Sequence, residues 1–114
     1  MYPDLAQKRI IITGASKGIG RALVQGFLAE GSNVVGLSRS GAPTGLDASE
    51  RFSSVAIDVC DTEKITAWLA QEERAGKQFH VLINNAGLRF PCNMLDCSAT
   101  QFDQLFGINA RAPF

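Results

Sequence analysis

The stretch Ile10-Ile11-Ile12-Thr13-Gly14-Ala15-Ser16-Lys17-Gly18-Ile19-Gly20 decides the fold of this chain. Its three consecutive β-branched apolar residues predict a strand that is buried on both faces. A glycine-rich turn follows at once. Apolar or small residues then recur at helical spacing, at Ile19, Ala22, Leu23, Gly26 and Phe27. We therefore predict a strand, a glycine turn and a helix in immediate succession.

This arrangement predicts an anion-binding site at the helix N-terminus. The first backbone N–H groups of a helix have no intrahelical partner, and the helix dipole adds to their attraction for an anion. Glycine has no Cβ, so a pyrophosphate can approach the backbone closely. The spacing of Gly14, Gly18 and Gly20 is G-x-x-x-G-x-G, which differs from both G-x-G-x-x-G and G-x-x-x-x-G-K. The alternative is a glycine-rich turn without a ligand.

Composition narrows the class of protein. The 114 residues suffice for one domain with a core, and 11 basic residues balance 11 acidic ones. Because no basic block is present, nothing indicates nucleic acid or an anionic membrane surface as a partner. No apolar run approaches the ~20 residues of a membrane span, and the N-terminus lacks the pattern of a signal peptide.

Cysteine and histidine usage predicts no metal site. Cys60, Cys92 and Cys97 lack C-x-x-C spacing, and His80 is the only histidine, placed where we expect a buried strand to begin. We interpret the cysteines as free thiols in a reducing cytoplasm. Cys92 is a poor candidate for a nucleophile, because no histidine lies near it in the sequence.

Strands and helices alternate along the chain, which predicts an α/β fold with a parallel sheet and right-handed crossovers. Residues 1–7 are expected to form a short leader and residues 40–49 a loop. Gly31 is expected to cap the first helix, and Asp61 or Thr62 to begin the second. The predicted strands are 9–13, 33–38, 52–59 and 79–84, and the predicted helices are 18–30, 62–76 and one from Ser98 onward.

Two later helices show apolar faces. The second predicted helix carries Ile65, Trp68 and Leu69 on one side. Ser98-Ala99-Thr100-Gln101 is a capping-box pattern, and it is followed by a stripe formed by Phe102, Leu105, Phe106 and Ile108.

Four features resemble the short-chain dehydrogenase/reductases, most closely the 3-oxoacyl-acyl-carrier-protein-reductase type. Residues 13–20 match the T-G-x-x-x-G-x-G motif, and Asp58-Val59 matches an adenine-contacting pair. Asn84-Asn85-Ala86-Gly87 matches the N-N-A-G motif, and Asn109 falls at the helix asparagine of the family. In this order and context the motifs are specific, whereas each alone would be weak.

The resemblance implies a Rossmann-type doubly wound sheet with strand order 3-2-1-4 and an oxidoreductase that interconverts carbonyl and hydroxyl groups by hydride transfer. It also implies that Asn109 is catalytic, helping to hold a water relay to a lysine. The expected cofactor-binding residues are Thr13, Gly14, Ser16, Lys17, Gly18, Ile19, Gly20, Ser38, Arg39, Asp58, Val59, Asn85, Ala86 and Gly87.

Several of these residues have a purely structural alternative. Asp58 would accept from the adenine amine, or it could cap the next turn. Asn84 and Asn85 end a strand and could simply satisfy neighbouring backbone groups. Gly87 would let the backbone pass close to the ribose. Asn109 needs a hydrogen-bond partner, which an ordinary helix-to-loop contact could supply.

The residues after the second strand favour NADP(H) over NAD(H). Folds that select NAD place an acid there for the ribose 2′-hydroxyl, and folds that select NADP place an arginine nearby. This chain has Ser38-Arg39-Ser40 and no acid, and Lys17 in the glycine turn adds a second cation. The alternative is that both cations are ordinary solvated side chains.

The chain departs from the family after Asn109. The family's chemistry needs a serine and a Tyr-x-x-x-Lys motif, whereas the single tyrosine here is Tyr2, with Ala6 four residues later. We therefore interpret residues 1–114 as a single NADP-binding half-domain, inactive alone, that ends before the catalytic helix. The full-length form would be a homo-oligomer acting on a small carbonyl or alcohol. The loop at 88–97 is expected to border its pocket. The alternative is a non-catalytic dinucleotide-binding or scaffold module that needs a partner.

Overall fold

The computed structural model describes residues 2–41, 50–88, 93 and 95–114. It confirms the predicted α/β architecture, with a four-stranded parallel sheet in the order β3-β2-β1-β4. The strands are β1 (Arg9–Thr13), β2 (Asn33–Ser38), β3 (Phe52–Ala56) and β4 (Val81–Ile83), and the α-helices are α1 (Gly18–Ala29), α2 (Thr62–Arg74) and α3 (Ala99–Phe106).

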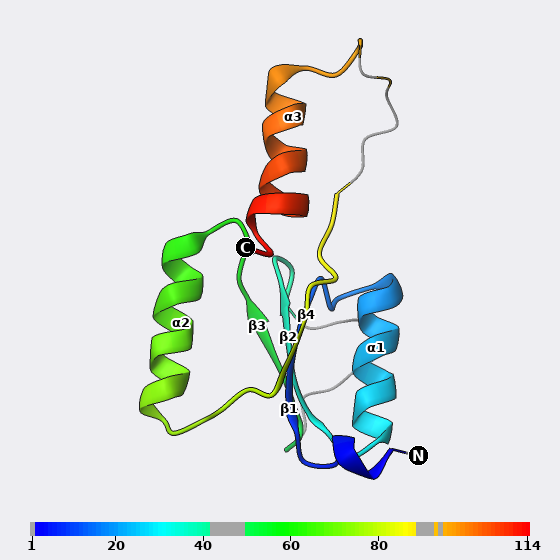
Figure 1. The fold of residues 1–114 in the computed structure, drawn as a ribbon, viewed down its shortest axis with the longest axis vertical. Helices are drawn as coiled ribbons and strands as arrows, with labels where there is room; N and C mark the ends of the chain where they lie inside the picture. Colours follow the sequence, from blue (N-terminus) through cyan, green and yellow to red (C-terminus); the bar gives the residue numbers. More distant parts are fainter. Residues whose placement is uncertain (1, 42–49, 89–92, 94) are drawn as a thin grey trace.

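The helices take three different positions around the sheet. Figure 1 shows α1 on one face and α2 on the opposite face, while α3 stands beyond the carboxyl ends of the strands. The turns that follow the strands therefore meet α3 at one end of the molecule. The N-terminal residues lie at the other end, where Pro3–Leu5 form a short 3-10 turn within the expected leader.

Burial of β1 on both faces is confirmed. Ile10 and Ile12 are fully buried in a cluster on the α1 side, whereas Ile11 joins a second cluster on the α2 side. This division follows from the two-residue period of a strand. β2 is divided in the same way, with Val34 in the first cluster and Val35 in the second.

The predicted apolar face of α1 is confirmed at Leu23 and Phe27, which pack against the first cluster. It was wrong at Ile19, which is 73% exposed, and it missed Val24, which is fully buried. Gly20 is also buried and faces the glycine turn. A glycine carries no hydrophobic signal, so the apolar spacing did not place Gly20 on the buried face.

Two strands are shorter than predicted. β3 ends at Ala56 rather than at residue 59, and β4 spans Val81–Ile83 rather than 79–84. The strand ends follow the pairing partner, because β4 pairs only with Ile10–Ile12 of β1. The expectation of a buried fourth strand was also wrong, since Leu82 is 55% exposed at the edge of the sheet and His80 is exposed.

The predicted helix caps are confirmed. The Asp61 carboxylate accepts a hydrogen bond from the Lys64 N–H at 3.1 Å, and Ser98 and Gln101 exchange both bonds of a capping box. Gly31 follows the first helix with φ of 85°. The last predicted helix is not uniform, because α3 gives way to a π-helical turn over Gly107–Arg111.

Some predictions fall outside the described residues. These are most of the loop after β2, at 42–49, and residues 89–92 and 94 of the loop expected at 88–97, Cys92 among them. Cys60 is a free thiol, as predicted. Within the described ranges, no helix has the length and hydropathy needed to cross a membrane.

Candidate functional site

The carboxyl ends of the strands and the first turn of α1 enclose a cleft of about 750 Å³. Ligands of open α/β sheets bind at this end, where the connections separate. The cleft brings together residues from five separate segments of the chain. Among its lining residues are the predicted Gly14, Ser16, Lys17, Gly18, Ile19, Ser38, Arg39, Asp58, Val59, Asn85, Ala86 and Gly87.

The three glycines of the turn have different roles. A Cβ on Gly14 would lie 2.9 Å from the Ala86 Cα, and a Cβ on Gly20 would overlap the Gly14 carbonyl. These two residues therefore allow the turn, the helix and the end of β4 to pack closely. Gly18 differs, because it has φ of 59° and nothing lies within 4 Å of its Cβ position. The backbone at Gly18 is therefore open to a ligand.

The first turn of α1 offers unpaired backbone N–H donors to the open space beside Gly18. Its N-cap residue, Lys17, makes no side-chain hydrogen bond to the turn, and the first turn contains no acidic residue. Backbone N–H groups at a helix N-terminus suit an anion such as a pyrophosphate. The open position at Gly18 and these donors fit the diphosphate of a dinucleotide.

Thr13 joins the end of β1 to the segment after β4. Its Oγ1 accepts hydrogen bonds from the N–H groups of Asn85, at 3.0 Å, and of Ala86, at 2.9 Å. The Asn85 side-chain amide donates to the Gly14 carbonyl at 3.0 Å. Thr13 and Asn85 therefore fix the segment after β4 against the end of β1 and the glycine turn. Asn84 instead lines a neighbouring hollow.

Asn109 lies in the π-helical turn and is bound to the loop after β4. Its Oδ1 accepts from the Leu88 N–H at 2.9 Å, and its Nδ2 donates to the Leu88 carbonyl at 2.9 Å. This is the helix-to-loop contact weighed as an alternative. Leu88 also lines the cleft, as expected for the start of the loop at 88–97, whereas its hydrogen bonds to Asn109 were not predicted.

The turn after β2 carries the expected specificity residues. Ser38 is buried, and its hydroxyl donates to the Gly41 carbonyl at 2.7 Å, so it holds the turn in place. Arg39 and Ser40 are exposed and line the cleft together with Lys17. None of the ion pairs among the described residues involves Lys17 or Arg39.

The residues after β3 form another wall. One carboxylate oxygen of Asp58 accepts from the Cys60 N–H at 2.9 Å, so Asp58 does stabilise the next turn. The pKa of the Cys60 thiol is raised, first by partial desolvation and then by the charge and hydrogen bond of Asp58, although Cys60 is exposed overall. Arg111 and Arg39 oppose this increase in pKa. A raised pKa keeps Cys60 in its less reactive thiol form.

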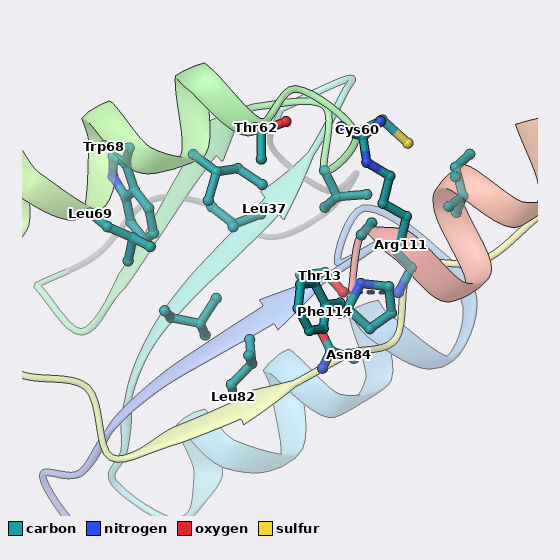
Figure 2. Close-up of a pocket in the computed structure, with 18 residues that line it drawn as sticks. Thr13, Leu37, Cys60, Thr62, Trp68, Leu69, Leu82, Asn84, Arg111 and Phe114 are labelled. Atoms are coloured by element: carbon teal, nitrogen blue, oxygen red, sulfur yellow. Dashed lines mark hydrogen bonds between the residues drawn. The ribbon is translucent and has the colours of Figure 1, made fainter.

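A second hollow, of about 590 Å³, lies between α2 and the sheet. Figure 2 shows Trp68 and Leu69 of α2 on one side of it and Leu82 of β4 on another. Its lining is largely apolar, and Leu37, Val59 and Ala86 border both this hollow and the cleft. Sequence reasoning identified the apolar face of α2 but not the hollow that it borders.

Comparison with known proteins identifies the family. The family described as "short chain dehydrogenase" matches residues 8–114. The chain belongs to this family. It is 36% identical to L-xylulose reductase from Homo sapiens, over 95% of this chain and 43% of that protein. It is 32% identical to 3-oxoacyl-acyl-carrier-protein reductase MabA from Mycobacterium bovis, over 98% of this chain and 43% of that protein.

A solved structure agrees with this assignment. A short-chain dehydrogenase from Leptospira borgpetersenii, with bound NAD+, superposes with a TM-score of 0.90 at 27% identity, covering 96% of this chain and 42% of that one. The chain thus spans less than half the length of the relatives it matches. The predicted family, the resemblance to 3-oxoacyl-acyl-carrier-protein reductases and the Rossmann-type fold are confirmed.

The described residues also bear on metal binding. In the part of the chain that the structure covers, no group of three or more His, Cys, Asp or Glu side chains could hold a metal ion. His80 instead uses its Nδ1 atom as a hydrogen-bond acceptor from the Arg9 N–H. The expectation of a metal-free site stays a prediction.

Proposed function

We propose that residues 1–114 form the NADP(H)-binding part of a short-chain dehydrogenase that interconverts a small carbonyl compound and its alcohol. The observation that carries this proposal is the cleft itself. It combines the open position at Gly18, the unpaired first turn of α1 and two cations, Lys17 and Arg39. NADP(H), when bound, supplies the hydride that is exchanged with the substrate carbon.

Each wall of the cleft has a proposed task toward the cofactor. The N–H groups after Gly18 would hold the pyrophosphate, and Arg39 with Lys17 would bind the ribose 2′-phosphate. Asp58 lines the cleft, and its carboxylate would accept a hydrogen bond from the adenine amine. Asn85, Ala86 and Gly87 would border the nicotinamide ribose.

The proposed role of Asn109 is to position the loop after β4. Both polar atoms of its side-chain amide bond the backbone of Leu88, so Asn109 fixes the cleft wall formed by Gly87 and Leu88. A part in a water relay, as the resemblance implies, stays a prediction.

The chain supplies no evident acid or base for the carbonyl oxygen. Its one tyrosine, Tyr2, is near the N-terminus, and the Tyr2 N–H donates to the Glu30 carboxylate at 2.7 Å. This position is at the opposite end of the sheet from the cleft. We therefore expect the 114 residues to bind the cofactor without reducing a ketone. The alternative function, a dinucleotide-binding module that works with a partner, predicts the same result.

Cofactor preference tests the proposal. We expect NADP+ to bind the purified chain more tightly than NAD+ in a calorimetric titration. Arg39→Asp should weaken NADP+ binding about tenfold or more, because a charge-assisted hydrogen bond worth ~1.5–3 kcal/mol is replaced by repulsion. NAD+ binding should be retained.

Lys8→Asp is the matched control, since Lys8 is an exposed cation that precedes β1, away from the cleft. It should leave both affinities unchanged. Equal affinity of the unmodified chain for NADP+ and NAD+, or an equal effect of both substitutions, would contradict the assignment of Arg39.

A further inference from the structure

β4 is held to its neighbour β1 at both of its ends. The strand itself is short, and it pairs with β1 only through Val81–Ile83. After the strand, Asn85 and Ala86 donate to the Thr13 hydroxyl. Before the strand, His80 contacts Arg9. Because the cleft wall from Asn85 to Leu88 follows directly, its position depends on both attachments.

The attachment before β4 requires a neutral histidine. The backbone N–H of His80 donates to the Arg9 carbonyl at 2.8 Å. The backbone N–H of Arg9 donates to the ring Nδ1 of His80 at 3.0 Å. A histidine nitrogen accepts only when it carries no proton, so the proton of the neutral ring sits on Nε2. A protonated imidazole would place an N–H group opposite the Arg9 N–H.

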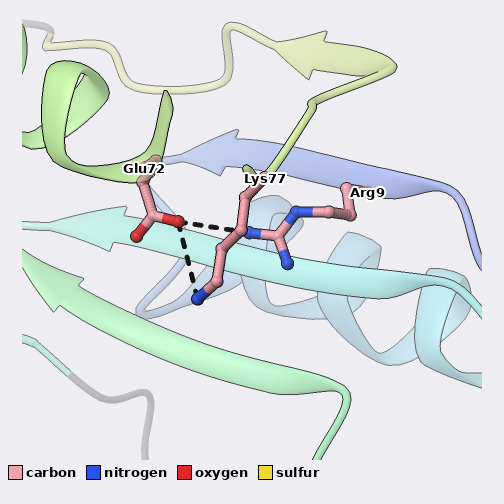
Figure 3. Close-up of polar contacts among 3 residues, drawn as sticks. All are labelled: Arg9, Glu72 and Lys77. Carbon is pink, nitrogen blue, oxygen red and sulfur yellow. Dashed lines mark hydrogen bonds and ion pairs between the residues drawn. The ribbon is translucent and has the colours of Figure 1, made fainter. Parts of the chain in front are cut away.

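Arg9 also takes part in a small network of charged side chains. Figure 3 shows that Arg9 and Lys77 share the carboxylate of Glu72, at 3.5 Å and 3.7 Å. The Arg9 guanidinium also lies 4.8 Å from the centre of the Phe79 ring. Arg9, Lys77 and Glu72 are therefore the charged groups linked to this attachment.

We propose that His80 is a positioning residue for the cleft, and that its protonation releases the start of β4 from β1. A protonated ring has no acceptor at Nδ1, so it cannot keep the hydrogen bond from the Arg9 N–H. Loosening of β4 carries over to Asn85 and Ala86 and weakens binding in the cleft.

The first test needs no ligand. In the full 114-residue chain, nitrogen NMR should show His80 with a proton on Nε2 and none on Nδ1 at pH 7.5. Exchange of the Arg9 amide should accelerate between pH 7.5 and 5.5, relative to that of the Ile12 amide, once the intrinsic effect of pH is corrected. A proton on Nδ1 at pH 7.5 would overturn the proposal.

The second test uses three proteins: the unmodified chain, His80→Asn and His80→Leu. The asparagine oxygen can replace Nδ1 as an acceptor and does not titrate, whereas leucine offers no acceptor. From pH 7.5 to 5.5, NADP+ binding to the unmodified chain should fall about five- to tenfold more than binding to His80→Asn, as expected for the loss of one hydrogen bond. His80→Leu should bind weakly at both pH values.

Using the ratio to His80→Asn removes the titration of the cofactor's own phosphate and of other cleft residues. Equal pH dependence of the unmodified chain and His80→Asn would overturn the proposal. The binding readout rests on the proposed function. If NADP+ fails to bind at pH 7.5, the proposed function fails, and the midpoint of thermal unfolding of the same three proteins at both pH values decides the role of His80.

Discussion

Gly18 differs from the other two glycines of the turn in what it leaves open. Gly14 and Gly20 allow backbone segments to pack against each other, whereas the space beside Gly18 is empty. The sequence predicted that all three glycines belong to one turn. It could not separate their roles, because these depend on Ala86 and Asn85, more than 60 residues further along the chain.

Gly18→Ala should therefore lose ligand binding in addition to stability. The residue has φ of 59°, and an L-residue in this region costs ~1–2 kcal/mol. Gly76 is a matched control, because it has φ of 74°, has open space at its Cβ position and follows α2 away from the cleft. Both alanine variants should lose similar stability in urea unfolding, and only Gly18→Ala should lose NADP+ affinity, by about tenfold or more. Equal NADP+ affinities of the two variants would contradict the claim that the ligand binds beside Gly18.

The same limit of sequence reasoning applies to Asn109. The sequence identified Asn109 as a helix asparagine, and its need for a hydrogen-bond partner followed from physical chemistry. Its partner, Leu88, lies 21 residues earlier in the chain and contributes only backbone atoms. No pattern of side chains marks such a partner, so the contact emerges only from the fold.

The presence of each helix and strand was easier to predict from the sequence than the residues at which it ends. The helices and strands were found from local periodicity and from caps such as Asp61 and Ser98, which act within a few residues. The ends of β3 and β4 depend on the register with a neighbouring strand, and the apolar sequence continues beyond that pairing. The buried face of α1 depends on the contact of Gly20 with the Gly14 turn, which apolar spacing does not record.

The connection from β1 to the segment after β4 should depend on the Thr13 hydroxyl. Thr13→Val keeps the shape of the side chain but leaves the Ala86 N–H without its acceptor, whereas the Asn85 N–H keeps the Ile83 carbonyl. One unsatisfied group costs ~1–3 kcal/mol, so we expect a loss of about 1–3 kcal/mol in the free energy of unfolding. Denaturation in urea measures this loss.

Thr13→Ser is the control, because it retains the hydroxyl and removes only a methyl group. It should keep most of the stability that Thr13→Val loses. If the valine variant proves as stable as the serine variant, the hydroxyl is not what joins β1 to the segment after β4.

At the scale of the whole molecule, burial is uneven. The sheet is covered on both faces near β1 and β2, whereas Leu82, Phe102 and Phe106 are each more than half exposed. These residues belong to the edge strand and to α3, which stands beyond the strand ends. The apolar stripe of α3 was predicted correctly as a pattern, but a stripe does not reveal whether the chain itself covers it.

The central claim is that the cleft at the carboxyl ends of the strands binds a nicotinamide dinucleotide. The most direct measurement is an NMR titration of the nitrogen-15-labelled chain with NADP+. We predict that shifted amides cluster at residues 14–20, 38–40, 58–59 and 85–88, while the indole N–H of Trp68 in the neighbouring hollow stays unchanged. The absence of shifts at millimolar NADP+, or shifts centred on Trp68, would contradict the claim.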